Sequence, residues 1–71
     1  MGKKVDVEDL ITAPMIAERL GVVDARVVHT WARRHNDFPR PVLESERIHV
    51  WLWSDVERWL RSSGRTHLLP D

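Results

Sequence analysis

The chain is 71 residues long, with 42% hydrophobic and 31% charged residues, which is the balance of one small globular domain rather than of a disordered or fibrous chain. It has no cysteine, so disulfides and thiolate metal sites are excluded, and a catalytic cleft of ordinary depth is not expected. Stability has to come from a few large side chains, since one core in this size range seldom contributes more than about 3 to 5 kcal/mol. The candidates are Trp31, Trp51, Trp53, Trp59 and Phe38.

Charge is balanced over the whole chain but not along it. Lys plus Arg and Asp plus Glu number 11 each, so the positive net charge that is typical of nucleic-acid-binding domains is missing. The segment 25–40, however, is strongly basic, with Asp37 as its one acidic residue. Its arginines are Arg26, Arg33, Arg34 and Arg40. This segment is the candidate for contact with an anionic partner, and the alternative is a merely solvated helix face.

The two ends of the chain predict tails around one folded unit. Residues 1–9 are charged and without period, and residues 63–71 contain Gly64 and Pro70, so the domain is expected over residues 10–62. No apolar run approaches the roughly 18 residues of a membrane span. The N-terminal residues also lack the short apolar core of a signal peptide, and the expected location is the cytoplasm.

The first predicted helix follows Thr12, whose side chain can cap it. Pro14 is tolerated in its first turn, because the amide that proline lacks has no partner there. Ile16 and Leu20 then stack four residues apart. Gly21 follows the last apolar position, where a helix usually ends in a left-handed residue.

A second helix is predicted from Ala25 to about Arg34, with Asp24 as its cap, so the two helices are joined by a tight turn. At about 100° of rotation per residue, the apolar side chains of this helix fall on one face and the polar ones on the other. The apolar face contains Val27, Val28, Trp31 and Ala32, and the polar face contains Arg26, His29, Thr30 and Arg33. The first face is expected to pack on the first helix and the second to face outward.

A hairpin is predicted after the second helix. Residues 35–41 contain two prolines, which forbid helix and favour an extended path, and Phe38 is expected to anchor this segment to the core. Residues 42–44 and 47–53 then predict two strands around a tight Ser45-Glu46 turn.

A last helix is predicted to run to about Ser62. Ser54 and Glu57 have the spacing of a capping box at its start. Its apolar positions, at helical spacing, are Val56, Trp59 and Leu60. The order helix, helix, hairpin, helix predicts a mainly α fold with a small β-hairpin, in the form of a miniature winged helix-turn-helix.

The outward face of the second helix has the residue types that read DNA. Arginine reaches guanine acceptors in the major groove, and threonine meets a base edge or a methyl group. Arg26 lies near the start of the helix, where recognition helices contact bases. Arginines further along the chain are better placed for phosphates. These are Arg33, Arg34 and Arg40, with Arg47 beside the hairpin turn as a contact to the neighbouring backbone or minor groove.

Two segments, LGVVDARVVHTWARRHNDFPRPV and VWLWSDVERWL, resemble the small excisionase-like and AlpA-like proteins of phages and mobile elements, relatives of the MerR-type winged-helix domain. The resemblance covers residues 10–62. Its most specific residues are Phe38, Pro39, Pro41 and Val42, then Trp51, Ser54, Asp55, Val56, Glu57, Trp59 and Leu60. It implies cooperative DNA binding and bending during prophage excision beside an integrase, or transcriptional regulation. The DNA contacts that the resemblance implies are Asp24 to Thr30 and Arg33 on the helix and Arg47 on the wing. Together with the arginines placed at phosphates above, the predicted site comprises Asp24, Ala25, Arg26, His29, Thr30, Arg33 and Arg34 on the helix, and Arg40 and Arg47 on the wing and its flank.

Two departures from that family pattern bear on the site. Such proteins often have a Ser-Arg-Ser/Thr run at the start of the recognition helix, and here Val23 intervenes and Asp24 to Arg26 take those places. The wing carries Glu44 and Glu46 where basic or glycine residues are common, so Arg47 ranks below the helix arginines as a DNA contact.

Part of the hairpin is a candidate protein interface. On one strand, Trp51 and Trp53 would share a face with His49, and a short chain cannot cover both faces fully. Trp53, with Leu52, is therefore expected to meet a second copy or an integrase. The alternative is that Trp53 folds over the last helix.

Metal binding and catalysis find little support in the sequence. The histidines at 29, 35, 49 and 67 lack the spacing of helical zinc ligands. No nucleophile elbow, glycine-rich phosphate loop or carboxylate pair is recognised, so neither enzyme activity nor a cofactor is expected. Two classes remain: a sequence-specific DNA-binding protein, as excisionase or small regulator, and a winged-helix module that binds other proteins.

Overall fold

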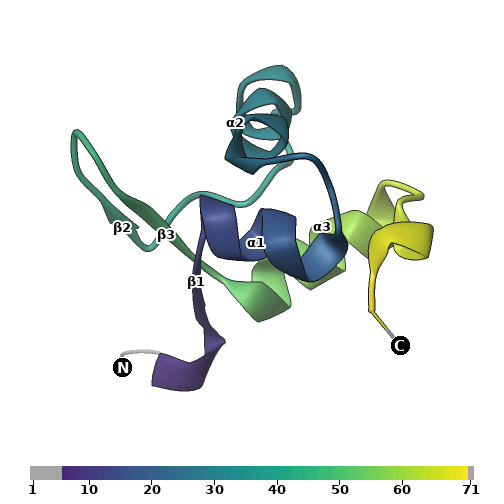
Figure 1. Ribbon diagram of the computed structural model, residues 1–71, viewed down its shortest axis with the longest axis horizontal. Coiled ribbons are helices and arrows are strands. Elements are labelled where there is room, and N and C mark those ends of the chain that lie inside the picture. The colour runs from purple at the N-terminus through teal and green to yellow at the C-terminus, as the bar shows by residue number, and fades with distance from the viewer. Residues whose placement is uncertain (1–5, 71) are drawn as a thin grey trace.

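The computed structural model describes residues 6–70. Within them the chain forms a small α+β fold of three α-helices and a three-stranded antiparallel sheet (Figure 1). The helices are α1 (Ala13–Leu20), α2 (Ala25–Arg34) and α3 (Trp53–Ser62), and the strands are β1 (Leu10–Thr12), β2 (Leu43–Glu44) and β3 (His49–Leu52). Two short 3-10 helices, η1 (Val7–Asp9) and η2 (Thr66–Leu68), lie near the ends. In Figure 1, α2 lies at the top and the β2–β3 hairpin projects to the left.

The predicted turn between the first two helices is confirmed. Gly21 ends α1 in the left-handed region, with φ at +71°, and its amide donates to the carbonyls of Ala17 and Glu18. This conformation strains any residue with a Cβ, which accounts for the glycine. Asp24 begins α2, and its carboxylate accepts a hydrogen bond of 2.8 Å from the Arg26 amide. Local residues thus set both the end of α1 and the start of α2.

The sheet has one strand more than predicted. β1 pairs with β3 with Ile11 opposite Trp51, and β2 pairs with the other edge of β3 with Glu44 opposite His49. The central strand is therefore β3, and the spatial order is β1-β3-β2. The sequence did not reveal β1, because it is three residues long and runs directly into α1, too short for an alternating pattern.

The hairpin itself is confirmed, but its strands and turn differ from the prediction. Glu44 lies opposite His49, and the Ser45 amide donates to the Ile48 carbonyl at 2.9 Å, so only Glu46 and Arg47 lie between the bonded residues at the tip. The tight turn is therefore one residue later than the predicted Ser45-Glu46 turn. β3 also ends at Leu52, since α3 begins at Trp53.

The predicted capping box of α3 is wrong as well. The residue before the helix is Leu52, and Ser54 lies inside the first turn. The cap comes instead from Asp9, whose carboxylate accepts from the Ser54 amide at 3.2 Å and from its hydroxyl at 2.6 Å. Glu57 pairs with Arg61 at 2.9 Å. An aspartate brought by chain folding thus takes the position that a local serine was expected to take.

The core lies between the helices and the sheet and contains three of the five large residues expected from the sequence, Phe38, Trp51 and Trp59, while Trp31 and Trp53 are half-buried against it. Phe38 is buried and packs edge-on against Trp59 and Trp51, with ring centroids 4.9 and 6.0 Å apart. The two indole N–H groups donate to Asp37 and to the Pro39 carbonyl, both at 3.0 Å. These bonds satisfy buried donors and hold the segment after α2 against the core. The other large buried residues are Ile11, Ile16, Leu20, Val28, Val56 and Leu60.

Folded structure extends beyond residues 10–62 on both sides. Asp9 is bonded to α3 as described, and Leu68 and Leu69 pack against the core. Arg65 lies over the Trp59 ring at 4.9 Å and near Trp31 at 5.8 Å. Residues 1–5 and 71, expected to belong to the tails, lie outside the described residues.

Candidate nucleic-acid interface

The two faces of α2 have opposite surroundings. Val28 is fully buried, and Trp31 is half-buried and packs against the core cluster. Arg26, His29 and Arg33 are exposed on the other side. The predicted division of α2 into an apolar inner stripe and a polar outer stripe is confirmed at these positions. The result is a helix that displays cationic and hydrogen-bonding side chains to the outside.

The inner stripe is narrower than predicted. Ala32, expected on the buried face, is exposed, because it lines an open hollow beside Pro39 and Pro41 rather than packing on α1. Ala25 lies against the core instead and is half-buried. Ala25 therefore presents little surface to a ligand.

Asp24 and Arg26 form an ion pair at the start of α2. The Arg26 Nη2 donates to Asp24 Oδ2 at 2.8 Å, and its Nε lies 3.1 and 3.2 Å from the two carboxylate oxygens. Hydrogen bonds from the side chain and the backbone amide of Arg26 lower the pKa of Asp24, and the carboxylate raises the pKa of Arg26. The Arg26 side chain is still 88% exposed. It is held at its base while it projects into solvent.

The Thr30 hydroxyl is turned toward its own helix. Its Oγ1 donates to the Arg26 carbonyl at 2.8 Å, and the residue is half-buried. A hydroxyl bonded in this way keeps its lone pairs available as acceptors, while its proton is taken. Among the polar residues predicted on this face, Arg26, His29 and Arg33 are the more accessible.

The outer face of α2 is continuous with the hairpin. The His29 and His49 rings meet edge-on with centroids 5.8 Å apart. His49 in turn stacks on Trp51 and lies 3.1 Å from a Glu44 carboxylate oxygen. His49 was missed as a site residue. Alternation along the strand placed His49 on one face with Trp51 and Trp53, but no sequence pattern indicates that this face meets α2.

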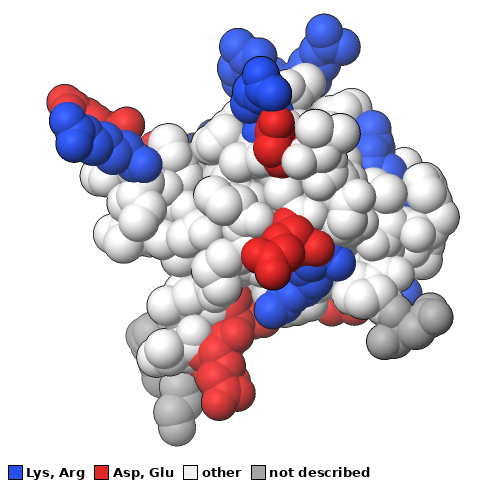
Figure 2. Space-filling view, viewed as in Figure 1, with Lys and Arg blue, Asp and Glu red and all other residues white. Residues whose placement is uncertain are grey.

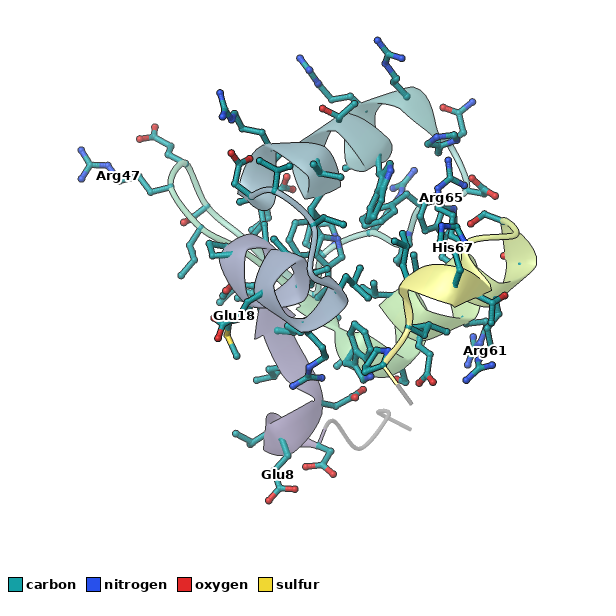
Figure 3. All side chains as sticks on the ribbon, turned by 45° about the vertical axis from the view of Figure 1, so that its right-hand side comes forward. Glu8, Glu18, Arg47, Arg61, Arg65 and His67 are labelled. Carbon is teal, nitrogen blue, oxygen red and sulfur yellow. The ribbon has the colours of Figure 1, made fainter. Side chains whose placement is uncertain are left out.

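The remaining predicted arginines surround this face. Arg33 and Arg34 in the last turn of α2, Arg40 after it and Arg47 in the hairpin loop are all exposed. Lys and Arg atoms gather over α2 at the top of the molecule in Figure 2, and Arg47 extends from the tip of the hairpin in Figure 3. Between helix and hairpin lies a hollow of about 430 Å³, lined by both charged and aromatic side chains. Its polar lining includes His29, Arg33, Arg40, Glu44 and His49.

The candidate protein-interface residues have different positions from those predicted. Trp53 does not continue the strand face of Trp51, because it is the first residue of α3, where it is half-buried under the Arg19 guanidinium at 4.7 Å. Leu52 lies in the sheet opposite Leu10. The exposed apolar side chains of the hairpin region are Val42, Leu43 and Ile48. An interface at Trp53 and Leu52 stays a prediction.

Among residues 6–70, no three His, Asp or Glu side chains are grouped as metal ligands, and no helix is long and apolar enough to cross a bilayer. Comparison of the chain with protein-family models, with curated protein sequences and with solved structures gives no significant match. Function is therefore inferred from the residues and their arrangement.

Proposed function

We propose that this protein binds double-stranded DNA in a sequence-specific manner as a small winged helix-turn-helix domain. In this proposal α1 and α2 form the helix-turn-helix, α2 enters the major groove and the β2–β3 hairpin is the wing. The observation that carries the proposal is the outer face of α2, where Arg26, His29 and Arg33 are exposed while Val28 anchors the helix to the core. A major groove about 12 Å wide admits one α-helix.

The positions of the arginines suggest that they contact different parts of the DNA. Arg26 is in the first turn of α2, where a recognition helix approaches base edges. Arg33 and Arg34 are in the last turn, which suits phosphate contacts that fix orientation. Arg40 and Arg47 flank the helix and suit the adjacent backbone, although Glu44 and Glu46 weaken the attraction of the hairpin for phosphates.

Within this class we favour an excisionase that bends attachment-site DNA for an integrase, on the residues that resemble excisionase-like proteins. A small transcriptional regulator of the AlpA or MerR type would use the same surface and is the alternative. A lone domain buries only about 600 to 1,000 Å² on DNA, so we expect tandem sites, cooperative assembly or a protein partner. DNA bending assays with and without an integrase distinguish the two roles.

The DNA-binding proposal is tested by selecting a preferred duplex from a random pool and titrating it in gel shifts over a salt series. We expect the affinity to fall steeply as salt rises, and Arg33→Ala to reduce the slope of log K against log salt by about one unit. Arg61→Ala is the matched control, because it removes the same charge from α3, away from α2 (Figure 3). Equal slopes for both variants would contradict a phosphate contact at Arg33.

A second candidate function is a winged-helix module that binds other proteins. It is favoured by the zero net charge and by the exposed apolar side chains of Val42, Leu43 and Ile48 in the hairpin region. Such a set of residues fits a protein interface better than a phosphate backbone. Absence of any gel shift at low salt, with long attachment-type DNA and with the random pool, would favour this module over DNA binding.

A further inference from the structure

The ion pair at the start of α2 leaves a specific part of the Arg26 guanidinium free. A guanidinium has N–H donors on Nε, Nη1 and Nη2 in a fixed planar arrangement. Asp24 takes the donor on Nε and one on Nη2. Both hydrogens of Nη1 and the second hydrogen of Nη2 stay available. These lie on the end edge of the group, which forms two parallel hydrogen bonds with a guanine O6 and N7.

Asp24 is itself held in place by the helix that it caps. Its Oδ1 accepts from the Arg26 backbone amide at 2.8 Å, so one carboxylate binds both the main chain and the side chain of the same residue. This double attachment fixes the direction in which Arg26 leaves the helix. A flexible arginine loses rotamer freedom when it binds a base, and an arginine already restrained loses less.

The carboxylate also changes how Arg26 interacts with phosphates. Asp24 and Arg26 together carry no net charge, and the Asp24 side chain is 38% exposed on the same surface. The pair therefore attracts a phosphate backbone less than a lone arginine does. A guanine edge still finds two donors. The arrangement weakens non-specific binding to phosphates but keeps the donors that recognise guanine. Both effects increase the ratio of specific to non-specific affinity.

We infer that Asp24 is a positioning residue for base recognition, which orients Arg26 toward a guanine in the major groove and suppresses its contact with phosphates. This inference rests on the proposed DNA binding. It assigns to Asp24 an action through Arg26 rather than a direct base contact of its own.

The test is Asp24→Asn, because asparagine is as good a helix cap as aspartate but has one neutral acceptor oxygen in place of the two charged oxygens that hold Nε and Nη2 of Arg26. Glu8→Gln is the control, since it removes one exposed negative charge at the opposite end of the molecule from α2 (Figure 3). The readout is the ratio of affinities for the selected duplex and for the same duplex with the contacted guanine replaced. We expect Asp24→Asn to lower this ratio about two- to tenfold, the cost of ordering one freed side chain. Its affinity for random duplex is expected to stay or to rise.

A double-mutant cycle with Arg26→Ala separates positioning from a structural role. In the Arg26→Ala background, Asp24→Asn is expected to leave the ratio unchanged, because the residue that it positions is gone. With Arg26 present, we expect its Nε proton to exchange with solvent faster in the Asp24→Asn variant than in wild type, as measured by NMR. An equal loss of the ratio in both backgrounds would overturn the inference.

The experiments distinguish a failure of the positioning role of Asp24 from a failure of the proposed DNA binding. If Arg26→Ala abolishes the preference for guanine while Asp24→Asn and Glu8→Gln both leave it intact, DNA binding stands and the positioning role is wrong. If the wild-type protein neither shifts DNA nor selects a sequence, the proposed function fails and the inference fails with it.

Discussion

Two helices of this protein are capped by an aspartate, but one aspartate is adjacent to its helix in the sequence and the other is distant from it. Asp24 directly precedes α2 and bonds the amide of Arg26, two residues along the chain. Asp9 bonds the amide and hydroxyl of Ser54 at the start of α3, from a distance of 45 residues in the sequence. Both carboxylates satisfy free amides and lie at the positive end of a helix dipole. The first belongs to the candidate interface, while the second ties the N-terminal segment to the sheet and α3. The comparison therefore distinguishes a cap that positions an interface side chain from a cap that stabilises the fold.

The largest effect is expected at the distant cap. Asp9→Ala removes every bond from this carboxylate to Ser54 and is expected to lower the free energy of unfolding by about 1 to 2 kcal/mol. For a domain of this size that corresponds to a fall in Tm of roughly 4 to 16 °C, measured by circular dichroism. Asp6→Ala is the control, because the Asp6 carboxylate accepts from the neighbouring Glu8 amide at the exposed start of η1 and not from α3. If the two variants have equal Tm values, the Asp9 cap does not stabilise the fold.

A smaller effect is expected from the other partner in the same contact. Ser54→Ala deletes the 2.6 Å hydroxyl bond but keeps the amide bonds to Asp9. We expect a loss of about 0.5 to 1.5 kcal/mol in urea unfolding, in the range of one hydrogen bond. In the double variant Asp9→Ala/Ser54→Ala the two losses should not add, since both remove one contact. Additive losses would show that Ser54 acts elsewhere.

The contrast between the caps also explains which parts of the fold the sequence could predict. The end of α1 at Gly21, the cap at Asp24 and the burial of Val28 depend on residues within one or two helical turns, and all were predicted. The strand β1 and the cap of α3 depend on contacts between distant segments, and both were missed. The Ser54–Glu57 spacing suggested a local cap, but the fold offered Ser54 a charged partner, and a charge-assisted hydrogen bond is the stronger one.

The same limit holds for the candidate interface. The outer face of α2 was predictable, because helical geometry alone separates Arg26 and Arg33 from Val28. The contact of His29 with His49 was not, because it depends on how the hairpin packs beside α2. The pairing of Arg26 with Asp24 lies between these cases. The spacing of two residues allows it, yet only the structure shows that the capping carboxylate also reaches the guanidinium.

The smallest effect is expected at the local cap, and pH reveals it. Because hydrogen bonds from Arg26 lower the pKa of Asp24 below its ordinary value of 3.8, folding favours the charged carboxylate. The resulting stabilisation is present above pH 3.8 and is lost as the pH falls through the lowered pKa. Wild type should therefore have a higher Tm than Asp24→Ala near neutral pH, by less than the Asp9→Ala effect, and the gap should narrow below pH 3.8. Thermal unfolding of both proteins from pH 6 down to pH 3 measures it. If the difference in Tm stays constant or widens on acidification, the charge on Asp24 does not stabilise α2. The caps at Asp24 and Asp9 would then differ in whether they stabilise a helix, and not only in the sequence distance to their partners.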